Sequence, residues 1–319
     1  MKSLVILIKD FDKRFPQAYR YLLDQGINVT IKDSLDSLSD RDYELFIQNA
    51  DAIFAGPGNY DAAFLSKAKR LGILSRMGSG MDNIDLEYAK AHGITVTNSK
   101  GGNTNAVAEM VVALMLTVVR NLVPANARVK DGQWRKDYVP GEELYGKTIG
   151  LMGFGMIAQR VAQLLAPFSL KLIACDTYMD TAIASKLGVA PVSFAELLTQ
   201  SDVISLHIPA LKENIGLFNH AVFTRMKKGV YFINCARGTL VEEDALYEAL
   251  ISGRVAAAAS DVFCSEPVTP DNKLLTLDNF IATPHIAGMT TKSSVDDSMI
   301  VVNSIVAFFN GKEPGYRVI

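Results

Sequence analysis

Short apolar runs alternate with amphipathic stretches along the first hundred residues of the chain. The short runs are typical of buried strands, and stretches with apolar positions three or four residues apart are typical of helices. The expected strands are 4–8, 28–31, 52–55 and 73–76, and the expected helices are 16–25, 39–47 and 61–70. This alternation predicts an α/β fold, in which helices cover both faces of a parallel sheet.

A second alternating run begins at residue 147. Its expected strands are 148–152, 171–175, 203–207, 230–234, 256–260 and 279–282, and its expected helices are 156–166, 181–187, 193–200, 221–226 and 242–252. One more helix is expected at 291–310. Because 319 residues are enough for two domains, the pattern predicts two doubly wound parallel sheets.

Residues 105–120 form a long segment with apolar side chains on all sides of a helix, which predicts a buried helix. About sixteen residues, interrupted by Glu109, are fewer than a membrane span requires, so no membrane contact is expected. Residues 121–145 are more polar and include Trp134 and Pro140. We interpret them as a connector or as an excursion onto a partner chain.

Composition narrows the class of protein further. The 49% apolar and 21% charged residues are ordinary for a globular protein, and a net charge of −2 gives no reason to expect nucleic acid as a partner. Three cysteines without a CxxC pair favour a reducing compartment, and four histidines without ligand spacing predict no metal site. The apolar run at 4–8 is too short for a signal peptide, so a cytoplasmic location is expected.

A glycine-rich turn lies between an expected strand and an expected helix, in the order Gly153-Phe-Gly155-Met-Ile-Ala158. Gly153 permits a tight turn, Gly155 lets the backbone approach a pyrophosphate, and the helix N-terminus offers free N–H groups. Asp176 ends the next expected strand, where a carboxylate binds ribose hydroxyls and repels a 2′-phosphate. Taken alone, such a turn is often just a turn of small residues, and such an aspartate is often just a solvated strand end. Together they predict a dinucleotide site that favours NAD over NADP.

Three polar side chains stand in distinct segments further along the chain. Arg237 lies in Ile233-Asn-Cys-Ala-Arg-Gly-Thr, Glu266 in Asp261-Val-Phe-Cys-Ser-Glu-Pro, and His285 in Thr283-Pro-His-Ile-Ala-Gly. Singly, they are equally well explained as a surface arginine, a loop acid and a strand cap. All three follow strands of the second run, so we expect them at the carboxyl edge of its sheet, facing one crevice between domains. A guanidinium, a carboxylate and an imidazole there are the groups that bind an anionic 2-oxo acid and move a proton.

On these segments the chain resembles the D-isomer-specific 2-hydroxyacid dehydrogenases over nearly its whole length. The resemblance implies a flavodoxin-like substrate-binding domain, 1–100 with 289–319, and a Rossmann NAD-binding domain, 101–288. It also implies that Arg237 holds the substrate's carboxylate and carbonyl oxygen, and that His285 is the general acid or base. Glu266 would hydrogen-bond His285 and favour its imidazolium form. Glu266 also argues against formate oxidation, because formate-specific relatives have glutamine there.

The resemblance further implies which residues contact cofactor and substrate. Cofactor contacts are expected from Gly153, Gly155, Met156, Ile157, Asp176, His207, Pro209, Cys235, Ala236, Asp261, Gly288 and Thr104. Substrate contacts are expected from Gly78, Ser79, Gly80, Arg237 and His285. Met156 replaces a polar residue common in the family, so a phosphate contact there must come from backbone. For His207 and Asp261, a satisfied buried histidine and a strand-end cap are the alternatives.

Within the family, the segments 75–85 and 103–109 are most similar to short D-3-phosphoglycerate dehydrogenases, so D-3-phosphoglycerate is the first choice of substrate. Arg76, Lys100 and Arg135 are candidates for its phosphate by loop position. A glyoxylate or hydroxypyruvate reductase is the nearest alternative. An NAD-sensing binding protein, or a Rossmann protein with another reaction, represents a different class. The family and the 105–145 region lead us to expect a homodimer.

Overall fold

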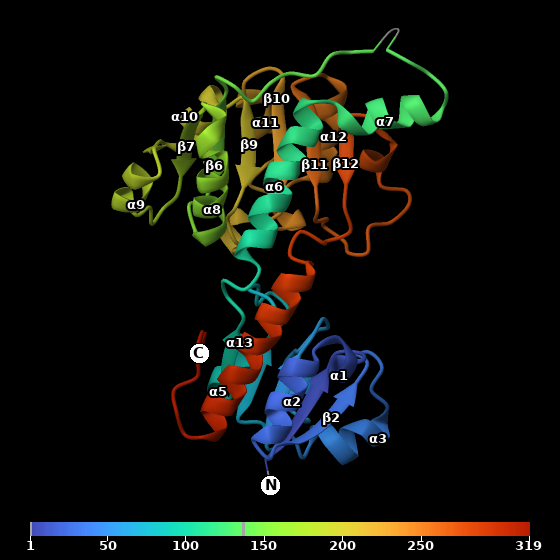
Figure 1. The fold of residues 1–319 in the computed structure, drawn as a ribbon, viewed down its shortest axis with the longest axis vertical. Helices are drawn as coiled ribbons and strands as arrows, with labels where there is room; N and C mark the ends of the chain where they lie inside the picture. The colour runs from blue at the N-terminus through green and yellow to red at the C-terminus, as the bar shows by residue number, and fades with distance from the viewer. Residues whose placement is uncertain (1, 136–137) are drawn as a thin grey trace. The chain divides into compact units, whose positions relative to one another are not determined.

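The computed structural model describes residues 2–135 and 138–319, and the chain divides into two compact units (Figure 1). The terminal unit comprises Met1–Asn103 and Met289–Ile319, and the central unit comprises Thr104–Gly288. Lys136 and Asp137, within the stretch interpreted as an excursion, lie outside the described residues.

The terminal unit contains a five-stranded parallel sheet in the order β2-β1-β3-β4-β5, the flavodoxin-like order. Its strands are β1 (Ser3–Leu7), β2 (Asn28–Lys32), β3 (Ala52–Ala55), β4 (Ile73–Arg76) and β5 (Thr95–Asn98). Its helices are α1 (Phe11–Arg14), α2 (Pro16–Asp24), α3 (Asp40–Asp42), the π-helical η1 (Tyr43–Ile47), α4 (Ala62–Leu65), α5 (Leu86–Ala91) and α13 (Thr291–Phe309).

Alternate residues of β1 enter separate cores on the two faces of this sheet. Leu4 and Ile6 pack with Val301 and Ile305 of α13. Val5 and Leu7 pack into the core on the opposite face. Side chains alternate between faces along a strand, so an apolar run buried on both sides is what a central parallel strand requires. The last helix of the chain thus shares an apolar core with the first strand and packs against β3, β4 and β5.

The central unit contains a seven-stranded parallel sheet in the order β12-β11-β10-β9-β6-β7-β8, the Rossmann order with one additional strand. Its strands are β6 (Thr148–Met152), β7 (Lys171–Cys175), β8 (Val189–Pro191), β9 (Val203–Leu206), β10 (Val230–Asn234), β11 (Val255–Ser260) and β12 (Phe280–Ala282). Its α-helices are α6 (Thr104–Val119), α7 (Leu122–Lys130), α8 (Met156–Leu165), α9 (Thr181–Lys186), α10 (Phe194–Gln200), α11 (His220–Arg225) and α12 (Glu243–Ile251). Short 3-10 turns are η2 (Ala166–Phe168), η3 (Lys212–Asn214), η4 (Gly238–Leu240) and η5 (Lys273–Thr276).

The two predicted sheets are confirmed, and several elements differ from expectation. The helix expected at 39–47 begins as α3, with a Ser39–Asp42 capping box, and continues as the π-helical η1; the helix expected at 61–70 is limited to α4. No element was predicted for β5, β8, α1, α5 or α7. β8 escapes the pattern because it has three residues and ends in proline, which an edge strand tolerates.

The expectation that α6 is buried on all sides was wrong. One face, with Val107, Val111 and Met115, enters the core, but Glu109 and Ala113 on the opposite face are exposed. Glu109 accepts a hydrogen bond from the Asn105 side chain rather than requiring a buried partner. Among the described residues, no single helix is long and apolar enough to cross a membrane; α6 and α7 reach that length only as a pair bent by 64°.

Candidate functional site

The glycine-rich turn after β6 lies where the central sheet reverses its strand order, between β6 and β9. Gly153 has a φ of 94°, and a Cβ there would lie 2.7 Å from the carbonyl oxygen of His207. Only glycine fits this approach of the two strand ends. Gly155, the N-cap of α8, has open space around its Cβ position and supplies no side-chain cap. The first N–H groups of α8 therefore have no cap, as an anion site requires.

Asp176 follows β7 and is bonded to this turn. Its Oδ2 accepts from the Phe154 N–H at 2.6 Å, and its Oδ1 accepts from the Tyr178 N–H at 2.8 Å. An ionised carboxylate offers about four acceptor sites, so two remain for ribose hydroxyls. The same charge would repel a 2′-phosphate.

His207, directly after β9, has a ring that burial keeps neutral. Burial lowers the pKa of His207 to about 4, and its Nε2 is buried without a hydrogen-bond partner among the described residues. An unpartnered buried ring nitrogen beside the turn is a position that a ligand can complete. Together with the open α8 N-terminus and the Asp176 carboxylate, it gives a donor and acceptor set that fits a dinucleotide such as NAD.

The other residues predicted to contact the cofactor are distributed as follows. Met156 and Ile157 are the first two residues of α8, and Thr104 is the first residue of α6. Cys235 and Ala236 form the turn after β10. Pro209, whose carbonyl accepts from the Asn214 side chain, follows β9, and Gly288 is the last residue of the central unit. Their contacts with a cofactor stay predictions.

His285 and Glu266 form a close ion-pair geometry in the central unit. The His285 Nδ1 lies 2.6 Å from the Glu266 Oε2, and the Glu266 Oε1 accepts from the Phe263 N–H at 3.0 Å. Because an ionised carboxylate only accepts, Nδ1 carries the proton and donates. The imidazole Nε2 is then left as the nitrogen that can take or give a proton.

Arg237 begins the η4 turn after β10, and its Nη1 donates to the Ala236 carbonyl at 2.7 Å. The next residue, Gly238, packs so closely on the loop that carries Glu266 that a Cβ would lie 2.0 Å from the Phe263 carbonyl carbon. The backbones of the arginine turn and the glutamate loop are therefore in direct contact. Of the three predicted catalytic residues, Glu266 and His285 touch, and Arg237 stands on the adjoining turn.

Asp261, the first residue after β11, is 1% exposed, and its carboxylate has three partners in the loop that follows β12. Oδ1 accepts from the Thr283 hydroxyl at 2.6 Å and from the Ile286 N–H at 2.9 Å, and Oδ2 accepts from the Ala287 N–H at 2.8 Å. The strand-end cap considered from the sequence is therefore present, and the nicotinamide contact stays a prediction.

In the terminal unit, the predicted substrate loop follows β4. The Gly78 N–H donates to the Ser99 hydroxyl at 2.7 Å, and the Ser79 carbonyl accepts from the Asn98 side chain at 3.0 Å. In the parts of the chain that the structure describes, the N–H groups of Ser79 and Gly80 have no acceptor. Of the residues predicted to bind substrate in this loop, Ser79 and Gly80 thus have N–H groups available to a carboxylate.

Sequence reasoning did not single out Asn234, the last residue of β10. Its side chain is buried and bonds to both ends of the turn that leads to Arg237. A polar residue that ends an otherwise apolar strand next to a predicted site was the available signal.

The cysteines near this site are poor candidates for nucleophiles, and the described residues form no metal-binding group. Burial raises the pKa of the Cys235 thiol well above its ordinary value and that of Cys264 to about 11, so both thiols stay protonated and weakly nucleophilic at neutral pH. In the described ranges, no group of three or more His, Cys, Asp or Glu side chains is placed to hold a metal ion.

Comparison with known proteins agrees with this geometry. Residues 112–287 match the family model of the D-isomer specific 2-hydroxyacid dehydrogenase NAD binding domain. The chain is 40% identical to a D-3-phosphoglycerate dehydrogenase of Archaeoglobus fulgidus over 296 residues, 92% of this chain and 56% of that protein. It is 42% identical to a hydroxypyruvate reductase of Thermotoga maritima over 234 residues, 73% of this chain and 76% of that protein.

Among solved structures, a D-lactate dehydrogenase from Aquifex aeolicus complexed with NAD and lactic acid has a TM-score of 0.86 and 31% identity, covering 97% of this chain and 96% of that one. The chain spans about half the length of several phosphoglycerate dehydrogenases that it matches. The family model and these relatives show that the chain belongs to the D-isomer specific 2-hydroxyacid dehydrogenase family and contains its NAD-binding domain.

Proposed function

We propose that this protein is an NAD-dependent dehydrogenase that interconverts a small 2-hydroxy acid and the corresponding 2-oxo acid. The observation that carries the proposal is the 2.6 Å contact between His285 Nδ1 and Glu266 Oε2 on a loop packed against the Arg237 turn. Such a contact leaves the opposite ring nitrogen as a proton donor or acceptor. Family membership supplies the reaction class.

In the direction of reduction, Arg237 binds the substrate's carboxylate and carbonyl oxygen through its planar guanidinium. Bound NADH supplies the hydride that adds to C2 of the oxo acid. The protonated His285 gives its Nε2 proton to the carbonyl oxygen as that oxygen gains electron density, and Glu266 keeps the ring oriented. In the direction of oxidation, neutral His285 takes the hydroxyl proton. The free N–H groups of Ser79 and Gly80 are proposed to bind the substrate's carboxylate.

We take NAD rather than NADP as the preferred cofactor because of the Asp176 carboxylate beside the glycine-rich turn. Gly153, Gly155 and the first turn of α8 would hold the phosphates. His207 would offer a neutral ring nitrogen.

D-3-phosphoglycerate is the substrate that we place first, because several relatives at 38–40% identity are named D-3-phosphoglycerate dehydrogenase. Hydroxypyruvate is the second candidate. It is favoured by the Thermotoga maritima relative, of which this chain covers 76%, compared with 56% or less of the three phosphoglycerate enzymes.

The proposed activity and the proposed substrate are both tested by NADH oxidation with the purified protein. The oxo acids to compare are 3-phosphohydroxypyruvate, hydroxypyruvate, glyoxylate and pyruvate. A kcat/KM for one acid at least tenfold above the others would support the activity and identify the substrate. Binding of NADH without turnover of any of these acids would contradict the enzyme and favour an NAD-sensing protein.

We also propose that the protein is a homodimer that acts in the cytoplasm. The α7 region exposes several large apolar side chains, Leu122, Val123, Val129 and Trp134, the last of them 73% exposed. Large apolar side chains that are exposed close together in one segment of the chain are what an interface would cover. Sedimentation of Leu122→Asp should give a monomer where the wild type gives a dimer, and Leu23→Asp, at an exposed leucine of α2, serves as the control. A monomeric wild type at micromolar concentration would contradict the dimer.

A further inference from the structure

Asp297 of α13 is a buried carboxyl group that the proposed reaction does not use. It is 5% exposed, and its Oδ1 has no hydrogen-bond partner among the described residues. This oxygen lies against Gly102, where a Cβ would be 2.0 Å from it. Burial raises the pKa of Asp297 to about 6, so at neutral pH the group is mostly ionised at a cost in stability.

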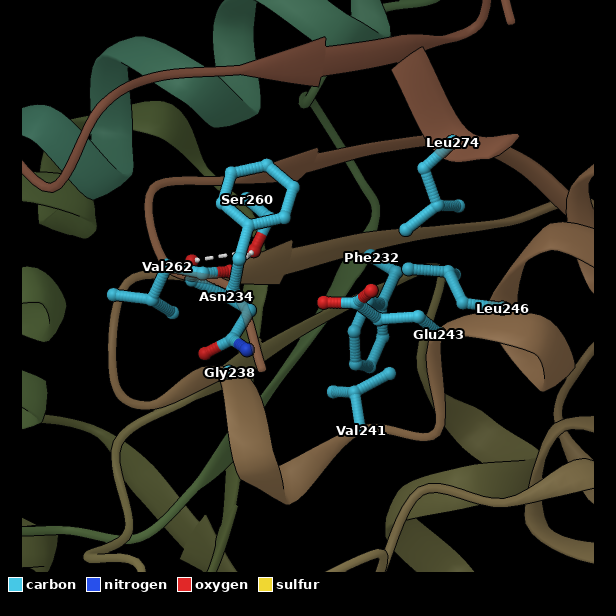
Figure 2. A pocket seen from close by; sticks show the side chains of 10 residues that line it. Phe232, Asn234, Gly238, Val241, Glu243, Leu246, Ser260, Val262 and Leu274 are labelled. Carbon is cyan, nitrogen blue, oxygen red and sulfur yellow. Dashed lines mark hydrogen bonds between the residues drawn. The ribbon is translucent and has the colours of Figure 1, made fainter. Parts of the chain in front are cut away.

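The polar groups around a small cavity in the central unit show the more usual arrangement (Figure 2). The cavity has a volume of about 10 Å³, and Asn234 and Ser260 are among the residues that line it. The Ser260 hydroxyl donates to the Val262 carbonyl at 2.7 Å, and the Asn234 amide both accepts from and donates to the backbone of the turn that follows. Such fully bonded groups stabilise the backbone around them. The unpaired oxygen of Asp297 calls for a reason other than stability.

The Asp297 carboxyl accepts a hydrogen bond from Ser99, the residue that follows β5, and this bond lowers its pKa. The Ser99 side chain is fully buried, and its hydroxyl oxygen accepts from the Gly78 N–H at 2.7 Å. A serine hydroxyl has a single hydrogen, which is directed to the carboxyl. Asp297 therefore sets the direction of the hydroxyl that holds Gly78.

The bonds at residues 98 and 99 also orient the two N–H groups that we assign to substrate binding. The Ser99 N–H donates to the Gly78 carbonyl at 3.3 Å, and the Asn98 side chain donates to the Ser79 carbonyl at 3.0 Å. In a planar trans peptide the N–H points opposite to the preceding carbonyl. The Ser79 N–H therefore points away from Ser99, and the Gly80 N–H points away from the Asn98 side chain.

We propose that Asp297 is a positioning residue for the substrate loop, residues 78–80, and acts through Ser99 on the peptide that presents the Ser79 N–H to the substrate's carboxylate. This inference rests on the proposed function, because it takes that N–H as a substrate contact. A hydrogen bond to a charged acceptor is roughly twice as strong as one to a neutral acceptor. The buried charge thus holds the loop more firmly than a neutral side chain of the same size, and the N–H groups are oriented before the substrate arrives.

Few other charged groups act on Asp297. Arg76, at the end of β4, lowers its pKa, and Asp296, on the same helix, raises it. β3 and β5, which pack against α13, have no ionisable residue. The charged side chains of α2 and of the loop after β5 are exposed: Arg20, Asp24 and Lys100.

Steady-state kinetics of Asp297→Asn test the inference. The substitution keeps the size of the side chain and removes a buried charge, so the fold should be at least as stable as in the wild type. We expect the KM for the oxo acid to rise about three- to tenfold, because a neutral acceptor replaces a charged one. The kcat and the KM for NADH should stay within about twofold of wild type, because the cofactor site is not touched. A purely structural role predicts the opposite, a less stable fold with an unchanged KM for the oxo acid.

Ser99→Ala removes the acceptor of the Gly78 N–H and should raise the KM for the oxo acid at least about tenfold. In the Ser99→Ala background, Asp297→Asn should change this KM by less than about twofold, because the hydroxyl through which Asp297 acts is absent. The ratio of the KM of Asp297→Asn to that of the wild type should fall towards one as the pH falls through about 6, because the wild-type carboxyl is then protonated.

Hydrogen exchange examines the loop without turnover. The Gly78 N–H should exchange faster in Asp297→Asn than in the wild type, although the fold as a whole is not weakened. Asp51→Asn is the matched control. Asp51 accepts from the Ser3 N–H and forms an ion pair with Arg70, and it precedes β3 at the opposite edge of the same sheet. This variant should have a lower unfolding temperature and an unchanged KM for the oxo acid.

The outcomes separate this inference from the proposed function. No wild-type turnover of any oxo acid would overturn the proposed function and this inference with it. Wild-type turnover, together with an unchanged KM and unchanged Gly78 exchange in Asp297→Asn, would overturn only the positioning role. A lower KM in Asp297→Asn would also overturn it, because the carboxylate would then act by repelling the anionic substrate. Additive effects of Asp297→Asn and Ser99→Ala would show that Asp297 acts by a route other than Ser99, and would overturn it too.

Discussion

Replacing Glu266 by glutamine tests the proposed proton-transfer pair with the smallest change of shape. The glutamine keeps an oxygen that can accept from either the Phe263 N–H or the His285 Nδ1–H. It loses the negative charge beside the imidazole, in a contact that is 2.6 Å long in the wild type. The expected result is a lower kcat and an unchanged KM for NADH, because the substitution affects the histidine and leaves the glycine-rich turn intact.

The size of the effect follows from burial. A charge-assisted hydrogen bond contributes about 1.5–3 kcal/mol when shielded from water. The side chains here are 53% exposed for His285 and 37% exposed for Glu266, so solvent screening reduces that contribution to about 1–2 kcal/mol. Since about 1.4 kcal/mol corresponds to tenfold in rate, kcat should fall roughly 5- to 30-fold. His285→Ala, which removes the proton donor itself, should lower kcat by about 10² to 10⁴.

Stopped-flow or steady-state NADH oxidation with the preferred oxo acid measures both variants. Glu248→Gln is the control, because Glu248 forms a similar but looser pair with His220, 3.6 Å long and more than half exposed, between α11 and α12. It should leave kcat unchanged. Wild-type turnover in Glu266→Gln, or a loss in that variant as large as in His285→Ala, would refute the view that the carboxylate acts by orienting the imidazole.

Three further predictions address the cofactor, the fold and pH. Asp176→Ala should raise the kcat/KM ratio of NADPH to NADH at least tenfold; an unchanged ratio in coenzyme kinetics would place the specificity elsewhere. Gly238→Ala puts a Cβ 2.0 Å from backbone of Phe263, so denaturant unfolding should show a loss of at least about 1–3 kcal/mol, and wild-type stability would contradict the close packing. Burial raises the pKa of Asp297 from 3.8 to about 6, so the folded state holds this proton more tightly, and the associated stability is lost as pH rises through about 6. Asp297→Asn should therefore gain stability relative to wild type between pH 5 and 8, by up to about 2–3 kcal/mol in urea unfolding, whereas an equal pH dependence of both proteins would contradict it.

The two sheets were predictable because their central strands are apolar on both faces. Residues 149–151 and 203–206 are apolar or small at nearly every position, as strands covered on both sides must be. β5 escaped because three of the four residues of Thr95–Asn98 are polar. Its Thr97 is nevertheless buried, since its hydroxyl donates to Ser75 across to β4 at 2.6 Å. A hydrophobicity pattern does not predict a strand whose polar side chains are buried because they hydrogen-bond to a neighbouring strand.

The residue types of the site were also predictable, but their bonding was not. Arg237, Glu266 and His285 were selected from their segments, and the position of each after a strand indicated a shared sheet edge. The sequence did not indicate that the carboxylate oxygens of Asp261 accept hydrogen bonds from the loop that carries His285. It also did not indicate that His285 has a left-handed backbone conformation. These features depend on a contact between loops 19 to 26 residues apart, which local pattern does not encode.

Strand order explains why the candidate residues are spread along one edge instead of gathered at one point. All strands of the central sheet are parallel, so their carboxyl ends share an edge, and six neighbours in the order β7-β6-β9-β10-β11-β12 each end beside one candidate residue. In that order the residues are Asp176, Gly153, His207, Arg237, Asp261 and His285. With about 4.8 Å between neighbouring strands, the row extends over roughly 24 Å, the scale of an extended dinucleotide rather than of a small acid. The carboxylate that would select the cofactor's ribose and the imidazole that would move the proton therefore lie at opposite ends of the row. Cofactor preference and proton transfer can then change independently in this sheet, because they depend on strands that share no contact.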